Sequence, residues 1–517
     1  MKKTFFLTLV LAASLSLQAQ SNKELRKLEL AEAAISRFYV DSVAEDKIVE
    51  SAIRAMLKEL DPHSTYSTPE EVAKLTEPLE GSFEGIGVTF NMVEDTLVVI
   101  QPVVKGPSEK VGILAGDRII AVNDSAIAGV NMPQTEITKR LRGPKGSMVK
   151  LSVLRQEVKN ILHFNVKRDK IPVHSLNAAY LAHSGIGYIQ FDQFGRHTHE
   201  EMIEAIQKLQ AEGMESLIID LQDNSGGYLD AAIDIVNEFL NTDEPIVYTE
   251  GRNSRRREYR ANGRGMFKNL PLMILVNQNS ASAAEILAGA IQDNDRGTIV
   301  GRRTYGKGLV QRAMSLPDEN MIRLTIARYY TPSGRCIQRP YEKGHKEDYN
   351  MDILHRIESG ELYHEDSVRL DKSVVYETLK DHRKVYGGGG IMPDFFVPVD
   401  TMQTNLYYRK LAVTSAFVKT TLKYLDKHRA QLKKDYPNFD KYYAYFEVDK
   451  ELLDNVVAEG KAAGVEYDEK GFQEGLKMIK LQLKGLLARD LWDTSEYFQI
   501  LNQVNPIVQK GLELLEE

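Results

Sequence analysis

Cysteine and tryptophan are almost absent from this sequence, because its 517 residues contain only one of each. The single cysteine, Cys336, excludes an internal disulfide, and its neighbours provide no base that would make it a nucleophile. Positive charge is not in excess, since the net charge is −7, so nucleic acid is not an expected partner. His197 and His199 lack a third ligand nearby, and we therefore expect no metal site and no cofactor.

Long hydrophobic runs are also scarce, and the one at the N-terminus is typical of a secretory signal. Met1, Lys2 and Lys3 give a basic start, a short apolar run follows, and small residues lie near Ala19. We therefore expect residues 1–19 to direct export to the periplasm or cell envelope and to be removed after Ala19. Retention of this segment as a membrane anchor is the alternative, although the run is short for a membrane span.

The pattern of apolar residues changes along the chain, which indicates several domains. The predicted fold class is a multidomain α+β protein with helical regions at both ends. The expected parts are an N-terminal helical region at 20–80, a small β domain at 81–168, a mixed α/β core at 169–400 and a C-terminal helical domain at 401–517. The basic run 252–260 is interpreted as a solvated loop, and the polar stretch 340–370 as an insertion or loop of unknown role.

A serine-containing turn between a buried strand and a helix is the first candidate for chemistry. Residues 272–276 are an apolar run typical of a buried strand, and a helix of small residues begins near Ser282. Backbone N–H groups at a helix N-terminus are unpaired and can stabilise a developing oxyanion. However, Ser282 and Glu285 also form a capping box, which requires no catalysis, and Ser280 offers a second hydroxyl. This motif alone does not distinguish a nucleophile from a helix cap.

A lysine between two glycines is the second candidate. Lys307 follows a predicted strand at 298–300 and is flanked by Gly306 and Gly308, which allow the backbone to approach another element closely. A lysine acts as a general base only when it is neutral, and burial favours the neutral form. A Ser/Lys pair is a known alternative to Ser/His/Asp. A surface lysine in a turn is the interpretation that requires no function.

Together the two motifs resemble those of the carboxyl-terminal processing peptidases, also called tail-specific proteases. The resemblance rests on Ser-Ala-Ser-Ala-Ala-Glu-Ile at 280–286 and on Tyr-Gly-Lys-Gly at 305–308 followed by Gln311, and it extends over most of residues 30–400. It implies a serine endopeptidase with a crotonase-like core. It also implies that Ser282 is the nucleophile, that Lys307 is the general base and that Gln311 orients the lysine.

The same resemblance assigns a role to a pair of glycines that follows another predicted buried strand. Gly226 and Gly227 end the run Asp-Asn-Ser-Gly-Gly at 223–227. In the family this loop and the residue after the nucleophile donate backbone N–H groups to the reacting carbonyl oxygen. The resemblance therefore implies an oxyanion hole made by Gly226 or Gly227 together with Ala283. An ordinary tight turn is the alternative.

The predicted β domain at 81–168 resembles a PDZ domain. Its segment Gly85, Ile86, Gly87 and Val88 would be the loop whose backbone N–H groups bind a peptide C-terminal carboxylate, with the peptide added as a strand. A small β-barrel without a ligand is the alternative. In related proteases an arginine near the end of this domain couples it to the active site, which makes Arg168 a candidate, although a charged linker residue is the favoured interpretation of this single position.

These features predict a serine endopeptidase that selects proteins by their C-terminal tails. The expected partners are protein or peptide substrates with free C-termini, and a homo-oligomer or a regulatory or adaptor protein stays open. A catalytically inactive PDZ scaffold of the cell envelope is the alternative function. A Ser/His hydrolase is disfavoured, since neither motif contains histidine and no Gly-x-Ser-x-Gly surrounds the serine.

Overall fold

The computed structural model describes residues 23–156, 158–183, 185–369, 374–400 and 405–517. These residues form two compact units. The first unit contains the described residues up to 72 together with 311–326 and 341–352, and the second contains the rest. The predicted signal at 1–19 lies outside the described residues. Among the residues described, no helix combines the length and the apolar character needed to span a bilayer.

The first unit combines helices with short strands. Residues 23–38 are helical, and β1 pairs antiparallel with the first half of β18. Asp61 ends the helical part, because its carboxylate accepts hydrogen bonds from the backbone N–H groups of His63 and Ser64 and from the hydroxyl of Thr325. The elements of this unit are α2 (Glu45–Lys58), β1 (Thr65–Ser67), η1 (Pro317–Glu319) and α9 (Lys346–Asn350), with α3 (Pro69–Glu80), β17 (Leu309–Ser315), β18 (Met321–Tyr330) and α10 (Asp352–Glu358) continuing into the second.

Residues 82–172 form a small antiparallel β domain in the second unit. Its sheet has the strand order β3-β4-β5-β7-β8, β6 pairs with β5, and β2 pairs with β9. Ile137 and Leu141 of α5 complete its hydrophobic core. The elements are β2 (Ser82–Gly85), β3 (Val88–Val93), β4 (Thr96–Pro102), α4 (Pro107–Lys110), β5 (Arg118–Val122), β6 (Ser125–Ala126), α5 (Gln134–Leu141), β7 (Met148–Leu154), β8 (Leu162–Lys167) and β9 (Asp169–Pro172).

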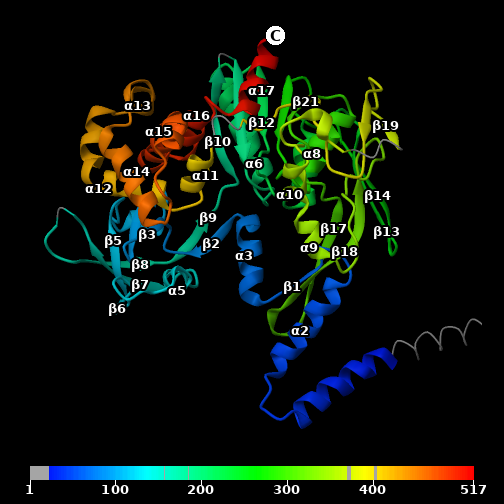
Figure 1. Ribbon diagram of the computed structural model, residues 1–517, viewed down its shortest axis with the longest axis horizontal. Coiled ribbons are helices and arrows are strands. Elements are labelled where there is room, and N and C mark those ends of the chain that lie inside the picture. The colour runs from blue at the N-terminus through cyan, green and yellow to red at the C-terminus, as the bar shows by residue number, and fades with distance from the viewer. Residues whose placement is uncertain (1–22, 157, 184, 370–373, 401–404) are drawn as a thin grey trace, which may run out of the picture. The chain divides into compact units, whose positions relative to one another are not determined.

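A six-stranded sheet with the order β10-β11-β12-β15-β16-β21 is the centre of the second unit (Figure 1). β10 is antiparallel to β11, and the other neighbours are parallel. Helices α6, α7 and α8 cover one face, and α17 covers the other. Because both faces are covered, β11 and β15 are buried at every position, which explains why β15 is apolar throughout and β11 is mostly apolar, with Gln190 as an exception. The elements are β10 (Leu176–His183), β11 (Ile186–Phe191), α6 (Thr198–Ala211), β12 (Ser216–Asp220), α7 (Leu229–Asn237), β15 (Leu272–Val276), α8 (Ala283–Asp293), β16 (Thr298–Gly301) and β21 (Phe395–Phe396).

The prediction of a solvated loop at 252–260 is wrong. Residues 254–260 form β14 (Ser254–Arg260), which pairs antiparallel with β13 (Pro245–Gly251), and β13 pairs with the end of β18. Most side chains of β14 are exposed, and the Arg256 guanidinium lies 3.9 Å from the ring centre of Tyr248. The charge that suggested a loop is therefore the solvent side of a sheet edge. The remaining elements before residue 400 are η2 (Glu365–Ser367), β19 (Val375–Glu377) and β20 (Lys384–Tyr386).

Residues 405–517 are helical, as their apolar spacing predicts. Asn405, Asn438 and Asp449 cap helices through side-chain oxygens that accept backbone N–H groups. One hydrophobic core unites the first six helices. The helices are α11 (Leu406–Ala412), α12 (Ala416–Asp435), α13 (Phe439–Tyr445), α14 (Lys450–Ala462), α15 (Glu469–Leu491), α16 (Thr494–Leu501) and α17 (Pro506–Glu516).

Candidate active site

Ser282 lies at the sharp turn between β15 and α8. Its backbone has φ 57° and ψ −113°, which is strained for a residue with a side chain and is typical of functional turns. The neighbouring Ser280 is fully buried, and its hydroxyl donates to the Leu221 carbonyl at 2.7 Å and accepts from the Asn277 N–H at 2.9 Å. Ser282 is only partly buried. Of the two hydroxyls, that of Ser280 is therefore already used in hydrogen bonds that stabilise the fold.

Glu285, in the first turn of α8, is a fully buried carboxylate with four hydrogen-bond donors around it. One oxygen accepts from the backbone N–H groups of Ser282 at 2.9 Å and Lys307 at 2.8 Å. The other accepts from the Gly306 N–H at 2.7 Å and the Thr304 hydroxyl at 2.5 Å. Burial raises the pKa of Glu285, and these four hydrogen bonds oppose that rise. One side chain therefore joins the serine turn to the lysine turn.

Lys307 lies in the turn between β16 and β17 and is half-buried. The glycines beside it are required by close contacts: a Cβ on Gly308 would lie 2.8 Å from the Gln338 backbone nitrogen, and Gly306 has φ 84°. The Tyr329 hydroxyl contacts the Lys307 carbonyl oxygen and lies 3.0 Å from the Ser282 carbonyl oxygen. This tyrosine is a second bridge between the two turns.

A buried ion cluster holds the start of the lysine turn. Glu361 accepts hydrogen bonds of 2.6 Å from both Arg303 and Arg356. Arg356 also donates to the carbonyl oxygens of Arg303 at 2.6 Å and Thr304 at 3.1 Å. All three charged side chains are at most 10% exposed, so each charge depends on its partners. Arg356 and Glu361 come from the stretch 340–370, and sequence analysis missed both of them.

The glycine pair after β12 lies against the serine turn. A Cβ on Gly226 would lie 2.7 Å from the Ser282 Cβ and 2.9 Å from the Ala283 backbone nitrogen, so no side chain fits there. The Gly226 N–H donates to the Asn224 side-chain oxygen at 2.8 Å. Asn224 also donates to the Phe191 carbonyl at 2.7 Å, which fixes the loop. Within the described residues, the N–H groups of Gly227 and Ala283 have no hydrogen-bond acceptor.

Gln311 belongs to the first unit, whereas Ser282 and Lys307 belong to the second. Its side-chain amide donates to the backbone carbonyl oxygen of His63. The His63 ring contacts the Tyr349 hydroxyl at 3.0 Å within the same unit.

The predicted carboxylate-binding loop lies between β2 and β3. Gly87 has φ 70°, and a Cβ there would lie 2.9 Å from a methyl carbon of Ile171. The Ile86 side chain is buried, and its carbonyl accepts from the Ser108 hydroxyl at 2.7 Å and N–H at 3.1 Å. The following strand, β3, is an edge strand of its sheet as far as the chain is described. The loop is thus held tightly beside a strand edge.

Arg168 is not an exposed linker residue, since only 8% of it is accessible. Its guanidinium donates to the carbonyl oxygens of Arg140 at 2.8 Å and Leu141 at 3.1 Å, at the C-terminus of α5. A positive charge at this end of a helix is favourable. It also donates to the Ser147 hydroxyl at 3.1 Å, so Arg168 contacts α5 and the turn that precedes β7.

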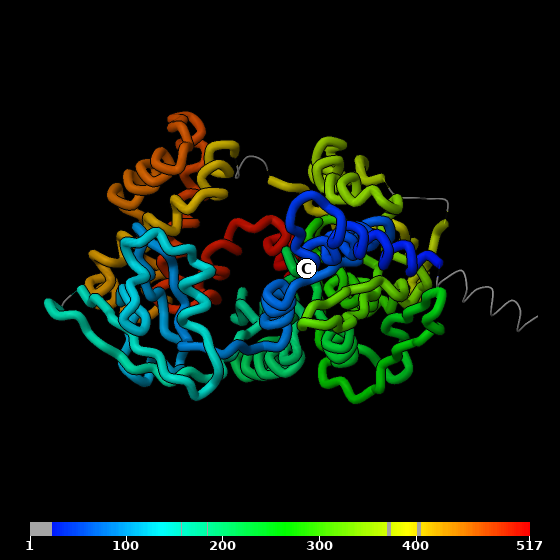
Figure 2. Tube along the Cα trace, turned by 90° about the horizontal axis from the view of Figure 1, so that it is seen from below, coloured from blue at the N-terminus to red at the C-terminus, as the bar shows by residue number. Residues whose placement is uncertain are grey.

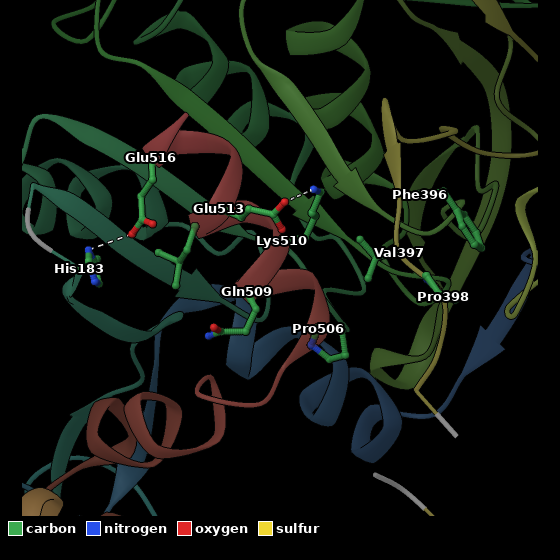
Figure 3. A pocket seen from close by; sticks show the side chains of 10 residues that line it. His183, Phe396, Val397, Pro398, Pro506, Gln509, Lys510, Glu513 and Glu516 are labelled. Carbon is green, nitrogen blue, oxygen red and sulfur yellow. Dashed lines mark hydrogen bonds and ion pairs between the residues drawn. The ribbon is translucent and has the colours of Figure 1, made fainter. Parts of the chain in front are cut away.

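A surface pocket of 670 Å³ lies beside α17 and is drawn in Figure 3. His183 is 3.0 Å from Glu516, and Lys510 is 2.7 Å from Glu513, so its charged side chains pair with one another. None of the predicted site residues is among the described residues that line it.

Several parts of the chain match known protein families. Residues 185–351 match peptidase family S41, residues 85–167 match the PDZ domain and residues 9–70 match the activating protease CtpB N-terminal domain. Residues 407–493 match a family of unknown function, DUF8443.

Two curated relatives are similar to this chain over most of their own length. The carboxy-terminal processing protease CtpB of Bacillus subtilis (strain 168) is 33% identical over 335 residues, which are 64% of this chain and 69% of the relative. CtpA of the same organism is 33% identical over 368 residues, which are 67% of this chain and 78% of the relative. Among solved structures, the photosystem II D1 C-terminal processing protease is 26% identical, with a TM-score of 0.37 over 73% of this chain and 88% of that one.

The family match, the PDZ match and the shared length of these relatives confirm the predicted family and the multidomain fold class. The chain therefore belongs to the carboxy-terminal processing protease family and is a serine-type peptidase of family S41.

Proposed function

We propose that this chain is an endopeptidase that cleaves proteins selected by their C-terminal tails, with Ser282 as nucleophile and Lys307 as general base. The observation that carries the proposal is the position of Glu285. Its carboxylate accepts hydrogen bonds from the backbone of both residues, so the turns bearing the hydroxyl and the amine are held together. A helix cap alone would need only the contact to Ser282.

In the proposed acylation step, the neutral Lys307 amine takes the hydroxyl proton as the Ser282 oxygen attacks the scissile carbonyl carbon. The tetrahedral intermediate collapses when the C–N bond breaks, and the leaving amine takes the proton from the lysine. Lys307 then deprotonates a water that attacks the ester carbonyl carbon, and as the ester C–O bond breaks, the protonated lysine returns the proton to the Ser282 oxygen. The step requires no metal or cofactor.

The proposed oxyanion hole consists of the backbone N–H groups of Gly227 and Ala283. Gly227 follows Gly226 in the loop beside Ser282, Ala283 is the first residue of α8, and neither N–H has an acceptor among the residues that the structure describes. The Gly226 N–H already donates to Asn224, so the proposed role of Gly226 is to leave room beside the nucleophile. Two such donors are the usual number for stabilising a tetrahedral oxyanion.

The role of Gln311 in orienting Lys307 rests on the family pattern alone, since it follows the lysine by four positions in the motif. Arg168 is proposed to couple the PDZ domain to catalysis by fixing the end of α5. Substitution of Gln311 or Arg168 tests each role directly.

Substrate selection is proposed to occur at Gly85, Ile86, Gly87 and Val88. Backbone N–H groups of this loop would bind the terminal carboxylate, and the tail would add as a strand beside the edge strand β3. Substrates would be proteins or peptides with free C-termini in the periplasm or cell envelope, which the chain would reach through the signal at 1–19. Residues 20–80, 81–168, 169–400 and 401–517 stay the proposed parts of the exported protein.

The proposal is tested with a peptide that has an apolar C-terminal tail, prepared as the free acid and as the amide. We expect Ser282→Ala and Lys307→Ala each to abolish cleavage, and the free acid to be cleaved with a lower KM than the amide. Full activity in either variant would refute the assignment. Failure of a serine-reactive probe to label Ser282 would instead favour the inactive tail-binding scaffold.

A further inference from the structure

The sheet of the PDZ domain has apolar side chains on both faces. In β4, Leu97 and Val99 belong to the core of the domain, whereas Val98 and Ile100 point to the opposite face. All four are at most 4% exposed. An antiparallel sheet with one face in water normally alternates apolar and polar residues. The uninterrupted run in β4 therefore requires a permanent cover on the second face.

Helix α12 of the C-terminal helical domain provides this cover. Leu422 forms one buried cluster with Val93, Val98 and Ile100, and Val418 packs against it. In Figure 1 and Figure 2 the orange helices lie beside the blue and cyan strands of the PDZ sheet. The contact buries the face that β4 would otherwise expose.

Polar contacts around the apolar cluster fix its orientation. Arg118 of β5 donates to Asp426 of α12 at 2.5 Å. Lys423 pairs with Glu94, after β3, at 2.8 Å. The Gln101 side chain of β4 donates to the carbonyl oxygen of Trp492 at 2.8 Å. Three neighbouring parts of the PDZ sheet thus contact the helical domain.

The helical domain is anchored at its other end to the central sheet. α16 packs against α15 and β10, and the Asn502 side chain donates to the Tyr180 hydroxyl of β10 at 2.8 Å. In α17, Ile507 and Val508 are buried against strands β12 and β15. β15 leads directly to Ser282. The helices therefore connect the PDZ sheet to the sheet that carries the nucleophile.

We propose that the helical domain at 405–517 is an intramolecular clamp, which holds the PDZ domain by its outer sheet face and fixes the distance from the tail-binding loop to Ser282. This assigns a role to the segment that matches only a family of unknown function. The delivery of tails rests on the proposed function, whereas the holding of the PDZ sheet does not.

The test uses the full chain and the ion pair between Arg118 and Asp426. Arg118→Glu and Asp426→Arg each replace an attraction by a repulsion, and the double variant restores the pair with reversed charges. Asp440→Arg, at an exposed position of the same domain, is the matched control. Hydrogen exchange of β4 and β5 amides reports the holding, and kcat/KM for the free-acid and amidated peptides reports tail delivery.

We expect each single variant to accelerate exchange in β4 and β5 roughly threefold to tenfold, as for loss and reversal of a partly exposed pair. Cleavage of the free acid should fall, cleavage of the amide should not, and the double variant should recover both properties. Exchange equal to that of Asp440→Arg would overturn the clamp. Faster exchange with unchanged cleavage of the free acid would overturn the role of the clamp in delivering tails. The exchange measurement does not depend on whether Ser282 is catalytic, so it tests the clamp separately from the proposed function.

Discussion

The carboxylate of Glu285 lies 2.8 Å from the backbone nitrogen of Lys307 and 2.9 Å from that of Ser282. A residue that looks like a helix cap therefore also determines where the lysine turn lies. The same carboxylate accepts two further hydrogen bonds. Both of its oxygens therefore face only donors, and a side chain that donates a hydrogen bond does not fit in its place.

The first prediction concerns Glu285→Gln. The amide nitrogen would face N–H donors, leaving two of them unsatisfied, so we expect the free energy of unfolding to fall by about 2–5 kcal/mol. Displacement of the lysine turn should lower kcat about 100-fold with little change in KM. Single-turnover cleavage and denaturant unfolding measure the two effects. Glu358→Gln, at an exposed position, is the control, and equal kcat in the two variants would contradict the role of Glu285.

The two serines of the motif should separate stability from catalysis. Ser280→Ala removes a buried hydroxyl that makes two hydrogen bonds, which should cost about 1–3 kcal/mol in unfolding free energy and leave kcat within about tenfold. Ser282→Ala removes the hydroxyl of the capping box, which should cost about 1 kcal/mol or less in unfolding free energy, and should lower kcat by about 10⁴-fold or more. Thermal unfolding and peptide cleavage test both, and the reverse pattern would identify Ser280 as the nucleophile.

Gly226→Ala should impair catalysis through a steric effect beside the proposed nucleophile. Its Cβ would lie 2.7 Å from the Ser282 Cβ, so the serine turn must shift. We expect kcat to fall about 10²–10³-fold, as for the loss of an oxyanion donor. Gly213→Ala is a closely matched control, because Gly213 has φ 98° against 96° at Gly226 but nothing within 4 Å of its Cβ. Equal losses of activity would show that backbone strain, and not the contact, is responsible.

Asp220, at the end of β12, should make stability depend on pH. Burial raises its pKa to about 6, although Tyr188 and Gln222 donate hydrogen bonds that lower it. The fold thus favours the protonated acid, and this stabilisation is complete below about pH 4 and is lost as the pH rises through 6.

The substitution Asp220→Asn removes this titration. The unfolding free energy of the variant, relative to the unsubstituted protein, should therefore rise by about 3 kcal/mol between pH 4 and 7. Urea unfolding at a series of pH values measures the difference. A difference that does not change with pH would mean that Asp220 titrates normally.

Local patterns in the sequence were sufficient for the family, the multidomain fold class and the order of helices and strands in the core. The buried strand β15 is a continuous apolar run and β11 is mostly apolar, which is why both could be predicted. β14 could not, because a charged strand at a sheet edge has the composition of a loop. The local sequence pattern does not reveal that β13 pairs with this strand.

The site was predictable only as far as its residues are close in sequence. The contact from Glu285 to Ser282 spans three positions, and the capping box reveals it. The contacts to Thr304, Gly306 and Lys307 join residues that are 19 to 22 positions apart in the sequence, so they leave no local signal. The same holds for Arg168, whose partners are carbonyl oxygens, which every residue has.

The ion cluster of Arg303, Arg356 and Glu361 restricts how this chain can vary in length. Insertions in enzymes usually tolerate deletion, but here Glu361 of such a segment pairs with the buried Arg303, and Arg356 binds the carbonyl oxygens that precede the lysine turn. A shortened segment would leave Arg303 uncompensated in the interior. Homologues that lack the segment should therefore carry an uncharged residue in place of Arg303, so that loss of the loop and loss of the arginine occur together in evolution.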